Sequence, residues 1–312
     1  MQSYLAKRLM NLWRNQPRAD DGSLNEIFRQ ARYLEGTPEE QRALRRSSSE
    51  WRYRYDTETP FFDLYFPDFD YRRFLAGRRV LDFGCFTGGR GVRWAKEYGL
   101  EKIYGTDINP VYIQAANEFA DAHGVPHDYK LLGPDGRIPF PDGEVDTIVT
   151  FDVLEHVDDL ERSMRECLRV LKPNGVMFVV FPSFYNPLES HLDLVTRMPA
   201  LQWFFSPKAL SQAYREILAD RGAEAAWYAP HGRAAWEKLP TLNGTTARAF
   251  RRLLARLPVG ILHETRTPVG VTGRRFSVVR KLVIKPVLQT ALAVRIFDDL
   301  LLDRVAMVLQ RQ

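Results

Sequence analysis

A glycine-rich turn follows the first apolar segment of the central region, in the sequence VLDFGCFTGGRG. A turn of this kind between a strand and a helix is where nucleotide-like ligands meet a helix N-terminus. A dinucleotide site needs glycine at the middle position of G-x-G-x-x-G, where this chain has Phe86. A P-loop needs a lysine and a hydroxyl residue, but Arg90 and Gly91 stand at those positions. The turn therefore fits neither phosphate-binding motif.

An acidic residue at the end of the next strand completes a different pattern. The turn keeps Gly84 and Gly88 in the spacing D-x-G-x-x-x-G after Asp82, and Asp107 follows in YGTDIN. A carboxylate at that place can accept hydrogen bonds from both ribose hydroxyls of an adenosine ligand, while glycines leave bare backbone for the ligand's amino-acid portion. Asp82 is a candidate partner for the cationic amino group of that portion. The pattern describes an S-adenosylmethionine site.

Two histidines are candidate bases for an acceptor hydroxyl, because histidine exchanges protons near neutral pH. His156 lies in VLEHV beside the fourth strand, where a structural role is an equal alternative. His191 lies in ESHLD, within a long connection after residue 181 that a substrate can reach, and its alternative is a surface loop histidine. Tyr185 and Trp203 are candidate walls of an acceptor pocket, with lid packing as their alternative.

Strands alternate with helices through the central part of the chain, which predicts parallel βαβ units. In the helix at 158–171, Leu160, Met164, Leu168 and Leu171 recur on one face that can cover a sheet. The expected strands are 78–84, 103–108, 128–132, 145–153, 176–181 and a short one near 223–228. The expected helices are 89–98, 110–123, 158–171 and 207–220.

The central motifs resemble those of the class I S-adenosylmethionine-dependent methyltransferases, in particular methyltransferase type 11. The resemblance rests on VLDFGCFTGG, YGTDIN, IPFPDGEVDTIVTFDVLEHV and LKPNGVMFVVFPS, and it covers roughly residues 78–221. It implies a doubly wound, Rossmann-like α/β sheet that binds S-adenosylmethionine. It also implies that Asp107 holds the ribose, that Asp135 or its neighbours in GPDG meet the adenine amino group, and that residues 152–156 lie near the transferable methyl group. The family usually has glycine where this chain has Phe86.

The candidate site residues fall into cofactor, catalytic and acceptor groups. The expected cofactor contacts are Asp82, Gly84, Cys85, Phe86, Gly88, Asp107, Ile108, Asp135, Phe151 and Asp152. The expected catalytic residues are His191, His156 and Asp152, and the expected acceptor contacts are Tyr185, His191 and Trp203. Cys85 is expected to be a small buried residue and not a nucleophile. No metal ligand set is predicted.

The chain divides into three parts: a helical N-terminal extension (1–75), the S-adenosylmethionine-binding domain (76–232) and a C-terminal lid or interface region (233–312). In the last part, residues 248–285 carry ten lysine and arginine residues against one acid, Glu264, which suggests an anionic neighbour. A final amphipathic helix is expected at about 287–310. Its acidic polar face favours packing on the enzyme body or in a homodimer over insertion into lipid.

The composition is that of an ordinary globular protein, with 312 residues, 45% hydrophobic and 27% charged. The two cysteines and the lack of a long apolar run predict a cytoplasmic protein without a transmembrane segment. We expect O-methylation of a small-molecule or sugar-containing metabolite. The alternatives are an RNA or other nucleic-acid methyltransferase, which the basic segment would serve, and a non-catalytic S-adenosylmethionine-binding assembly subunit.

Overall fold

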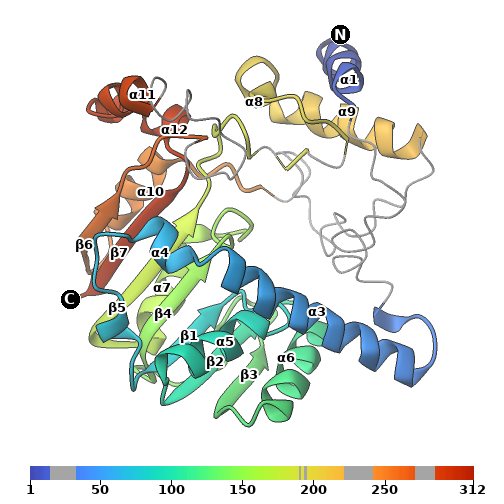
Figure 1. Ribbon diagram of the computed structural model, residues 1–312. Helices are drawn as coiled ribbons and strands as arrows, with labels where there is room; N and C mark the ends of the chain where they lie inside the picture. The colour runs from blue at the N-terminus through green and yellow to red at the C-terminus, as the bar shows by residue number, and fades with distance from the viewer. Residues whose placement is uncertain (15–32, 190, 193–194, 221–241, 271–284) are drawn as a thin grey trace.

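The computed structural model describes residues 1–14, 33–189, 191–192, 195–220, 242–270 and 285–312. Its strands are β1 (Arg79–Phe83), β2 (Lys102–Asp107), β3 (His127–Leu131), β4 (Val145–Phe151), β5 (Leu171–Phe181), β6 (Val259–Thr265) and β7 (Val305–Arg311). They form one sheet in the order β3-β2-β1-β4-β5-β7-β6 (Figure 1). The strands β1 to β5 pair in parallel, and β7 pairs antiparallel with both β5 and β6.

Helices cover both faces of this sheet, which confirms the doubly wound α/β fold. One face packs against α5 (Gly89–Tyr98) and α6 (Pro110–Ala122), and the other against α7 (Leu160–Val170) and α10 (Ala247–Leu254). Along β5, the side chains at 176, 178 and 180 belong to the first layer and those at 177, 179 and 181 to the second. This alternation follows from the two-residue period of a strand.

The predicted helices of the central part are confirmed, and local signals explain where they begin. The side chain of Asn109 accepts a hydrogen bond from the amide of Val111 at the start of α6, and Asp159 caps α7 in the same way. The predicted helix at 207–220 is α9 (Pro207–Asp220). The strand expected near 223–228 lies outside the described residues.

The N-terminal extension is helical, as predicted, in its described residues. It contains α1 (Gln2–Leu12), α3 (Pro38–Glu58), α4 (Phe61–Tyr65) and the short 3-10 helix η2 (Arg72–Phe74). A reciprocal capping box between Thr37 and Glu40 starts α3, with Pro38 at the first helical position. Figure 1 shows α3 running across α5 and α6, so this helix lies over the part of the sheet that carries the glycine-rich turn.

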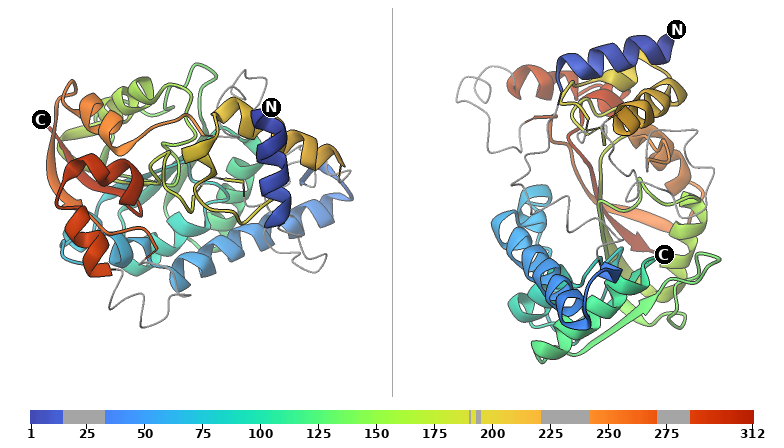
Figure 2. Two further views of the ribbon diagram at one scale, coloured as in Figure 1. Left: turned by 90° about the horizontal axis from the view of Figure 1, so that it is seen from above. Right: turned by 90° about the vertical axis from the view of Figure 1, so that its right-hand side faces the viewer.

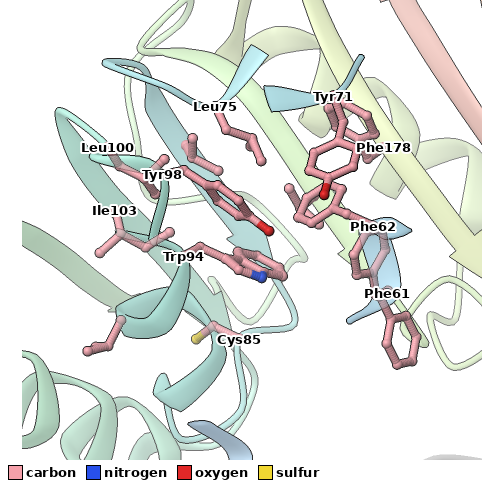
Figure 3. Close-up of a cluster of buried hydrophobic side chains, with 14 of the residues drawn as sticks. Phe61, Phe62, Tyr71, Leu75, Cys85, Trp94, Tyr98, Leu100, Ile103 and Phe178 are labelled. Carbon is pink, nitrogen blue, oxygen red and sulfur yellow. The ribbon is translucent and has the colours of Figure 1, made fainter. Parts of the chain in front are cut away.

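Aromatic side chains attach the N-terminal extension to the sheet. Phe62 of α4 packs against Trp94 of α5 and Phe178 of β5, with ring centroids 5.3 and 5.2 Å apart (Figure 3). Phe61 stacks on Phe151 at the end of β4 at 5.3 Å. The Arg-rich, aromatic segment before β1 is therefore part of the hydrophobic core.

The predicted final helix at 287–310 is wrong. The region instead contains α11 (Lys285–Ala291), the 3-10 helix η5 (Arg295–Phe297), α12 (Asp298–Leu301) and then β7. Residues 305–309 form a continuous apolar run, VAMVL, that is buried on both faces between β5 and β6. A short apolar run fits a buried strand as well as a helix, and here long-range pairing decided for the strand. The C-terminal part therefore completes the central sheet.

A second, smaller cluster of buried side chains lies apart from the sheet. There α1 lies beside α9, with α8 (Leu201–Phe204) close by (Figures 1 and 2). Ala6 and Met10 of α1 are buried against apolar residues of α9 and of the connection that follows β5. Among the helices of the described residues, none combines the length and the apolar character that a membrane crossing requires.

Part of the predicted basic segment pairs with acidic residues of the same chain. Arg251 binds Glu264 and Asp298, and Arg266 also binds Asp298. Arg256 reaches Glu161 of α7 at 3.0 Å. Arg274, Arg275, Arg280 and Lys281 lie outside the described residues. Asp298, an acid of the wrongly predicted helix, thus joins α12 to α10 and to the residue that follows β6.

Candidate functional site

A cavity of about 620 Å³ lies at the carboxyl ends of β1, β2 and β4. The strand order reverses at β1, and ligands of open α/β sheets bind at such a point. Of the predicted site residues, those that line the cavity are Gly84, Phe86, Asp107, Ile108, Asp135, Phe151, Asp152 and His156. Those outside its lining are Asp82, Cys85, Gly88, Tyr185, His191 and Trp203.

The glycine-rich turn needs its glycines for two different reasons. Gly84 lines the cavity and has a φ of +78°, and a Cβ atom there would lie 2.3 Å from Val153 Cγ2, so the Val153 side chain packs directly against its backbone. Gly88 has a φ of +74°, and a Cβ atom there would lie 2.6 Å from the Cβ of Ala116 in α6. Gly84 therefore lets Val153 approach the turn at the cavity wall, whereas Gly88 lets α5 and α6 approach each other.

Phe86 adopts a left-handed backbone with a φ of +51°, a conformation that non-glycine residues seldom adopt. Its ring packs edge-on against Tyr112 of α6, with centroids 4.4 Å apart. The turn thus keeps a glycine-like backbone at this position and adds an aromatic wall to the cavity.

Asp107 ends β2 and is held by the backbone of the turn. Its carboxylate accepts hydrogen bonds from the amides of Phe86, at 3.1 Å, and Asn109, at 3.0 Å. Burial raises the pKa of Asp107 from 3.8 to about 6, although these amide bonds act in the opposite direction. The carboxylate faces the cavity with hydrogen-bonding capacity to spare, as a ribose site requires.

Asp82 is engaged elsewhere. It is fully buried, and its carboxylate binds the guanidinium of Arg90 at 2.5 and 3.3 Å. Arg90 also donates to the carbonyl oxygen of Phe151 at 3.3 Å. The structure therefore does not support the predicted contact between Asp82 and a cofactor amino group. The pair instead ties β1, α5 and the end of β4 together beneath the cavity.

Arg52 of α3 is a site residue that the sequence analysis missed. It lines the cavity together with Trp51, and its guanidinium lies over the ring of Tyr55 at 5.4 Å. Burial and the nearby Arg90 lower the pKa of Arg52. Within the described ranges, Arg52 makes no ion pair. It comes from an arginine-rich helix far from the motifs, and no local pattern distinguishes it from its neighbours.

The remaining adenine-side and pocket predictions have mixed outcomes. Asp135 lines the cavity rim, where it accepts from the amide of Arg137 at 3.1 Å and pairs with Arg162 at 3.4 Å. Trp203 donates its indole N–H to the carbonyl oxygen of Tyr185 at 2.7 Å. That contact fits lid packing.

Burial raises the pKa of the Cys85 thiol well above its usual value, as expected for a buried, unreactive cysteine.

Charged and imidazole groups gather beyond the end of β4. Asp152 has a φ of +58°, and its carboxylate pairs with Arg304 at 2.8 Å. The rings of His156 and His191 pack together with centroids 5.0 Å apart. The predicted catalytic residues are thus close to one another, although only His156 and Asp152 line the cavity. Arg304 was missed because it immediately precedes β7, which the sequence analysis took for a helix.

A sequence profile described as "Methyltransferase domain" matches residues 81–179. The chain is 32% identical over 104 residues to norajmaline N-methyltransferase from Rauvolfia serpentina, covering 33% of this chain and 35% of that protein. It is 33% identical over 129 residues to ribosomal RNA small subunit methyltransferase C from Hahella chejuensis, covering 39% and 37%. It is 32% identical over 104 residues to chloroplastic tocopherol O-methyltransferase from Arabidopsis thaliana, covering 33% and 30%.

The aligned region spans about a third of each of these three relatives. A geranyl diphosphate methyltransferase, whose structure was solved in complex with SAM, aligns over 90% of this chain and 94% of its own, with a TM-score of 0.48 and 16% identity. The profile match falls on β1 to β5, and these strands include β1, β2 and β4, whose carboxyl ends form the cavity. Residues 81–179 thus match a methyltransferase domain, and the same region carries the similarity to the methyltransferases named above.

Proposed function

We propose that the chain transfers a methyl group from S-adenosylmethionine to an oxygen atom of a small-molecule or sugar-containing acceptor. The observation that carries the proposal is the cavity at the reversal of the strand order, which brings the Asp107 carboxylate, the bare backbone at Gly84 and the Arg52 guanidinium together. These three groups match a ribose diol, an amino-acid backbone and a carboxylate, which are all parts of one molecule.

The lining residues fit S-adenosylmethionine. Gly84 exposes backbone without a side chain at the cavity, and Asp107 retains acceptor capacity. Arg52 would pair with the cofactor's carboxylate, and Asp135 and its neighbours in the loop would lie at the adenine. When bound, the cofactor supplies a methyl group that is already activated on a sulfonium. The protein's task is then to place the acceptor and to exclude water, which supplies much of the rate in such displacements.

The choice of oxygen as the acceptor atom rests on the groups beyond β4. An acceptor hydroxyl must lose its proton, whereas sulfonium chemistry itself needs no acid or base. His156 lines the cavity, and His191 and Glu155 adjoin it. According to their names, the relatives reported above methylate different classes of molecule. They therefore do not decide the acceptor, and the proposal rests on this chain's own residues.

Transfer is tested by incubating the protein with methyl-labelled S-adenosylmethionine and a mixture of small metabolites, with a separate reaction on total RNA. We expect label in methyl ethers of low-mass products. Label in N-methyl or C-methyl products would overturn the acceptor atom. Label in RNA alone would favour the nucleic-acid alternative, and cofactor binding without any transfer would favour the assembly subunit.

Replacement of Asp107 by alanine is expected to weaken S-adenosylmethionine binding about ten- to hundredfold. The variant loses charge-assisted hydrogen bonds worth about 1.5 to 3 kcal/mol. Isothermal titration calorimetry measures the effect. The matched control is Asp121→Ala, which removes an exposed carboxylate of α6 outside the cavity lining. Equal affinity of the Asp107 variant and the control would contradict the ribose assignment.

Cofactor affinity is also expected to depend on pH through Asp107. Because burial raises its pKa to about 6, the ionised form that accepts hydroxyl hydrogen bonds best is dominant only above that pH. The affinity for S-adenosylmethionine should therefore be constant from about pH 7 to 7.5. Well below pH 6 it should fall by nearly tenfold for each pH unit, since only the fraction of protein with ionised Asp107 binds well. Titrations between pH 5 and 7.5 measure the profile. Asp107→Asn should lose this dependence, and a variant that keeps it would assign the profile to another group.

A further inference from the structure

Three potential metal ligands meet beside the cofactor cavity. Glu155 and His156 follow β4, and His191 comes from the connection after β5. One donor atom of each of the three side chains lies within 4.8 Å of the others. His156 also lines the cavity, so the cluster forms part of its wall.

The carboxylate of Glu155 needs a partner that the described residues do not provide. The residue is only 3% exposed, and neither carboxylate oxygen has a hydrogen-bond partner in the described part of the chain. The imidazole of His156 approaches to 3.7 Å, which is beyond hydrogen-bond distance. Buried carboxylates are normally paired, hydrogen-bonded or bound to a metal, because an isolated buried charge is strongly unfavourable.

The nearby guanidinium does not satisfy Glu155. Arg304 directs one nitrogen to Asp152 at 2.8 Å and another to Glu189 at 3.2 Å. Glu155 thus shares this region with two further carboxylates that already compete for that cation. An additional positive charge would balance the cluster.

The two imidazoles lie close enough to serve as ligands of one ion. The rings of His156 and His191 pack together with centroids 5.0 Å apart, beside the Glu155 carboxylate. Nitrogen ligands from two imidazoles combined with one carboxylate suit zinc and other divalent transition metals, whereas magnesium and calcium prefer oxygen ligands throughout.

We propose that Glu155, His156 and His191 bind one divalent transition-metal cation in the wall of the cofactor cavity. The ligand atoms need to approach one another by about 1 Å to reach metal bonds of about 2.0 to 2.2 Å. Three protein ligands leave coordination positions open for a further oxygen. The sequence analysis predicted no metal, because two of the ligands are adjacent and the third is 35 residues away, outside any standard metal-binding spacing.

The cation gives the acceptor side of the cavity a chemical role. An acceptor hydroxyl bound to it would have a lowered pKa. The O–H bond then breaks with its proton passing to solvent, and the oxygen forms a bond to the methyl carbon as the carbon–sulfur bond breaks. This consequence rests on the proposed function, whereas metal binding itself does not.

Cobalt(II) is a suitable probe because its visible absorption reports ligand type and coordination number. Titration of the full chain, previously treated with chelator, is expected to give about one equivalent bound with bands typical of nitrogen and oxygen ligands. Glu155→Gln and His191→Asn should each weaken binding by more than about 100-fold, the upper figure for the loss of an outer-shell partner. The matched control, His127→Gln, removes a histidine of β3 outside the cluster and should bind as the wild type does.

Circular dichroism of each variant separates loss of metal from loss of fold, and titration of S-adenosylmethionine into the chelated protein separates the two proposals. If cobalt does not bind, or if the folded Glu155 and His191 variants bind it as the wild type does, the metal-site proposal is overturned. The proposal of cofactor binding is then unaffected. Cobalt binding by a protein that fails to bind S-adenosylmethionine would overturn the proposed function and leave the metal site intact.

Discussion

Removal of residues 304–312 is expected to abolish cooperative folding. The deletion takes away β7, whose Val305, Ala306, Met307, Val308 and Leu309 are at most 2% exposed between β5 and β6. Burial of its four larger side chains contributes roughly 10 kcal/mol, at about 1.5 to 3 kcal/mol each. That is comparable to the whole stability of a typical domain, about 5 to 15 kcal/mol. Far-UV circular dichroism during heating, with size-exclusion chromatography, measures the result.

A pair of point variants provides the control for this truncation. Val308→Asp places an unpaired carboxylate in the core and should unfold the protein, whereas Gln310→Asp lies two residues further along the same strand, where the side chain reaches solvent. A truncated protein that keeps the thermal transition of the full chain would contradict the central position of β7. It would restore the sequence-based expectation of a peripheral C-terminal region.

Replacement of Arg90 by methionine is expected to destabilise the protein by about 3 to 5 kcal/mol. It leaves the fully buried carboxylate of Asp82 without its guanidinium partner, and breaking a buried pair costs this much. Urea denaturation followed by tryptophan fluorescence measures the loss, and the midpoint should fall with an unchanged slope.

The double variant Asp82→Leu with Arg90→Met tests the reason for that loss. Because no charge is then left buried, it should recover a large part of the stability. If Asp82 has only a structural role, the double variant should also keep its affinity for S-adenosylmethionine within a few-fold. A loss of more than tenfold in a folded double variant would return Asp82 to the cofactor site that the sequence analysis assigned to it.

The sequence predicts the parallel part of this fold well because its signals are local. The strands β1, β4 and β5 contain short apolar runs, and the helices α5, α6 and α7 each have a cap or an apolar face that is visible within about 15 residues. The same signals fail after residue 286. There the run VAMVL fits a helix together with Leu300 and Leu301, and only its pairing with β5, more than 120 residues earlier, makes it a strand.

The candidate site likewise combines residues that local sequence motifs predict with residues that they do not. Gly84 and Asp152 directly follow strands and Asp107 ends one, so the motif spacing places them at the cavity. Arg52 comes from α3 of the N-terminal extension, and Arg304 immediately precedes the last strand. Nothing in their neighbourhood marks them, because their role depends on contacts between distant segments. For the same reason, the unsatisfied state of Glu155 is visible only in three dimensions.

The position of β7 has a consequence for folding during synthesis on the ribosome. Of the seven strands described, β7 is synthesised last, yet it lies between β5 and β6, which have left the ribosome earlier. Until it arrives, β5 presents an unpaired edge and β6 has no neighbour in the sheet. Exposed strand edges are sites of wrong pairing between chains, and long-range pairing is slow. Nascent chains of this protein are therefore expected to depend on shielding of β5 until β7 has been synthesised.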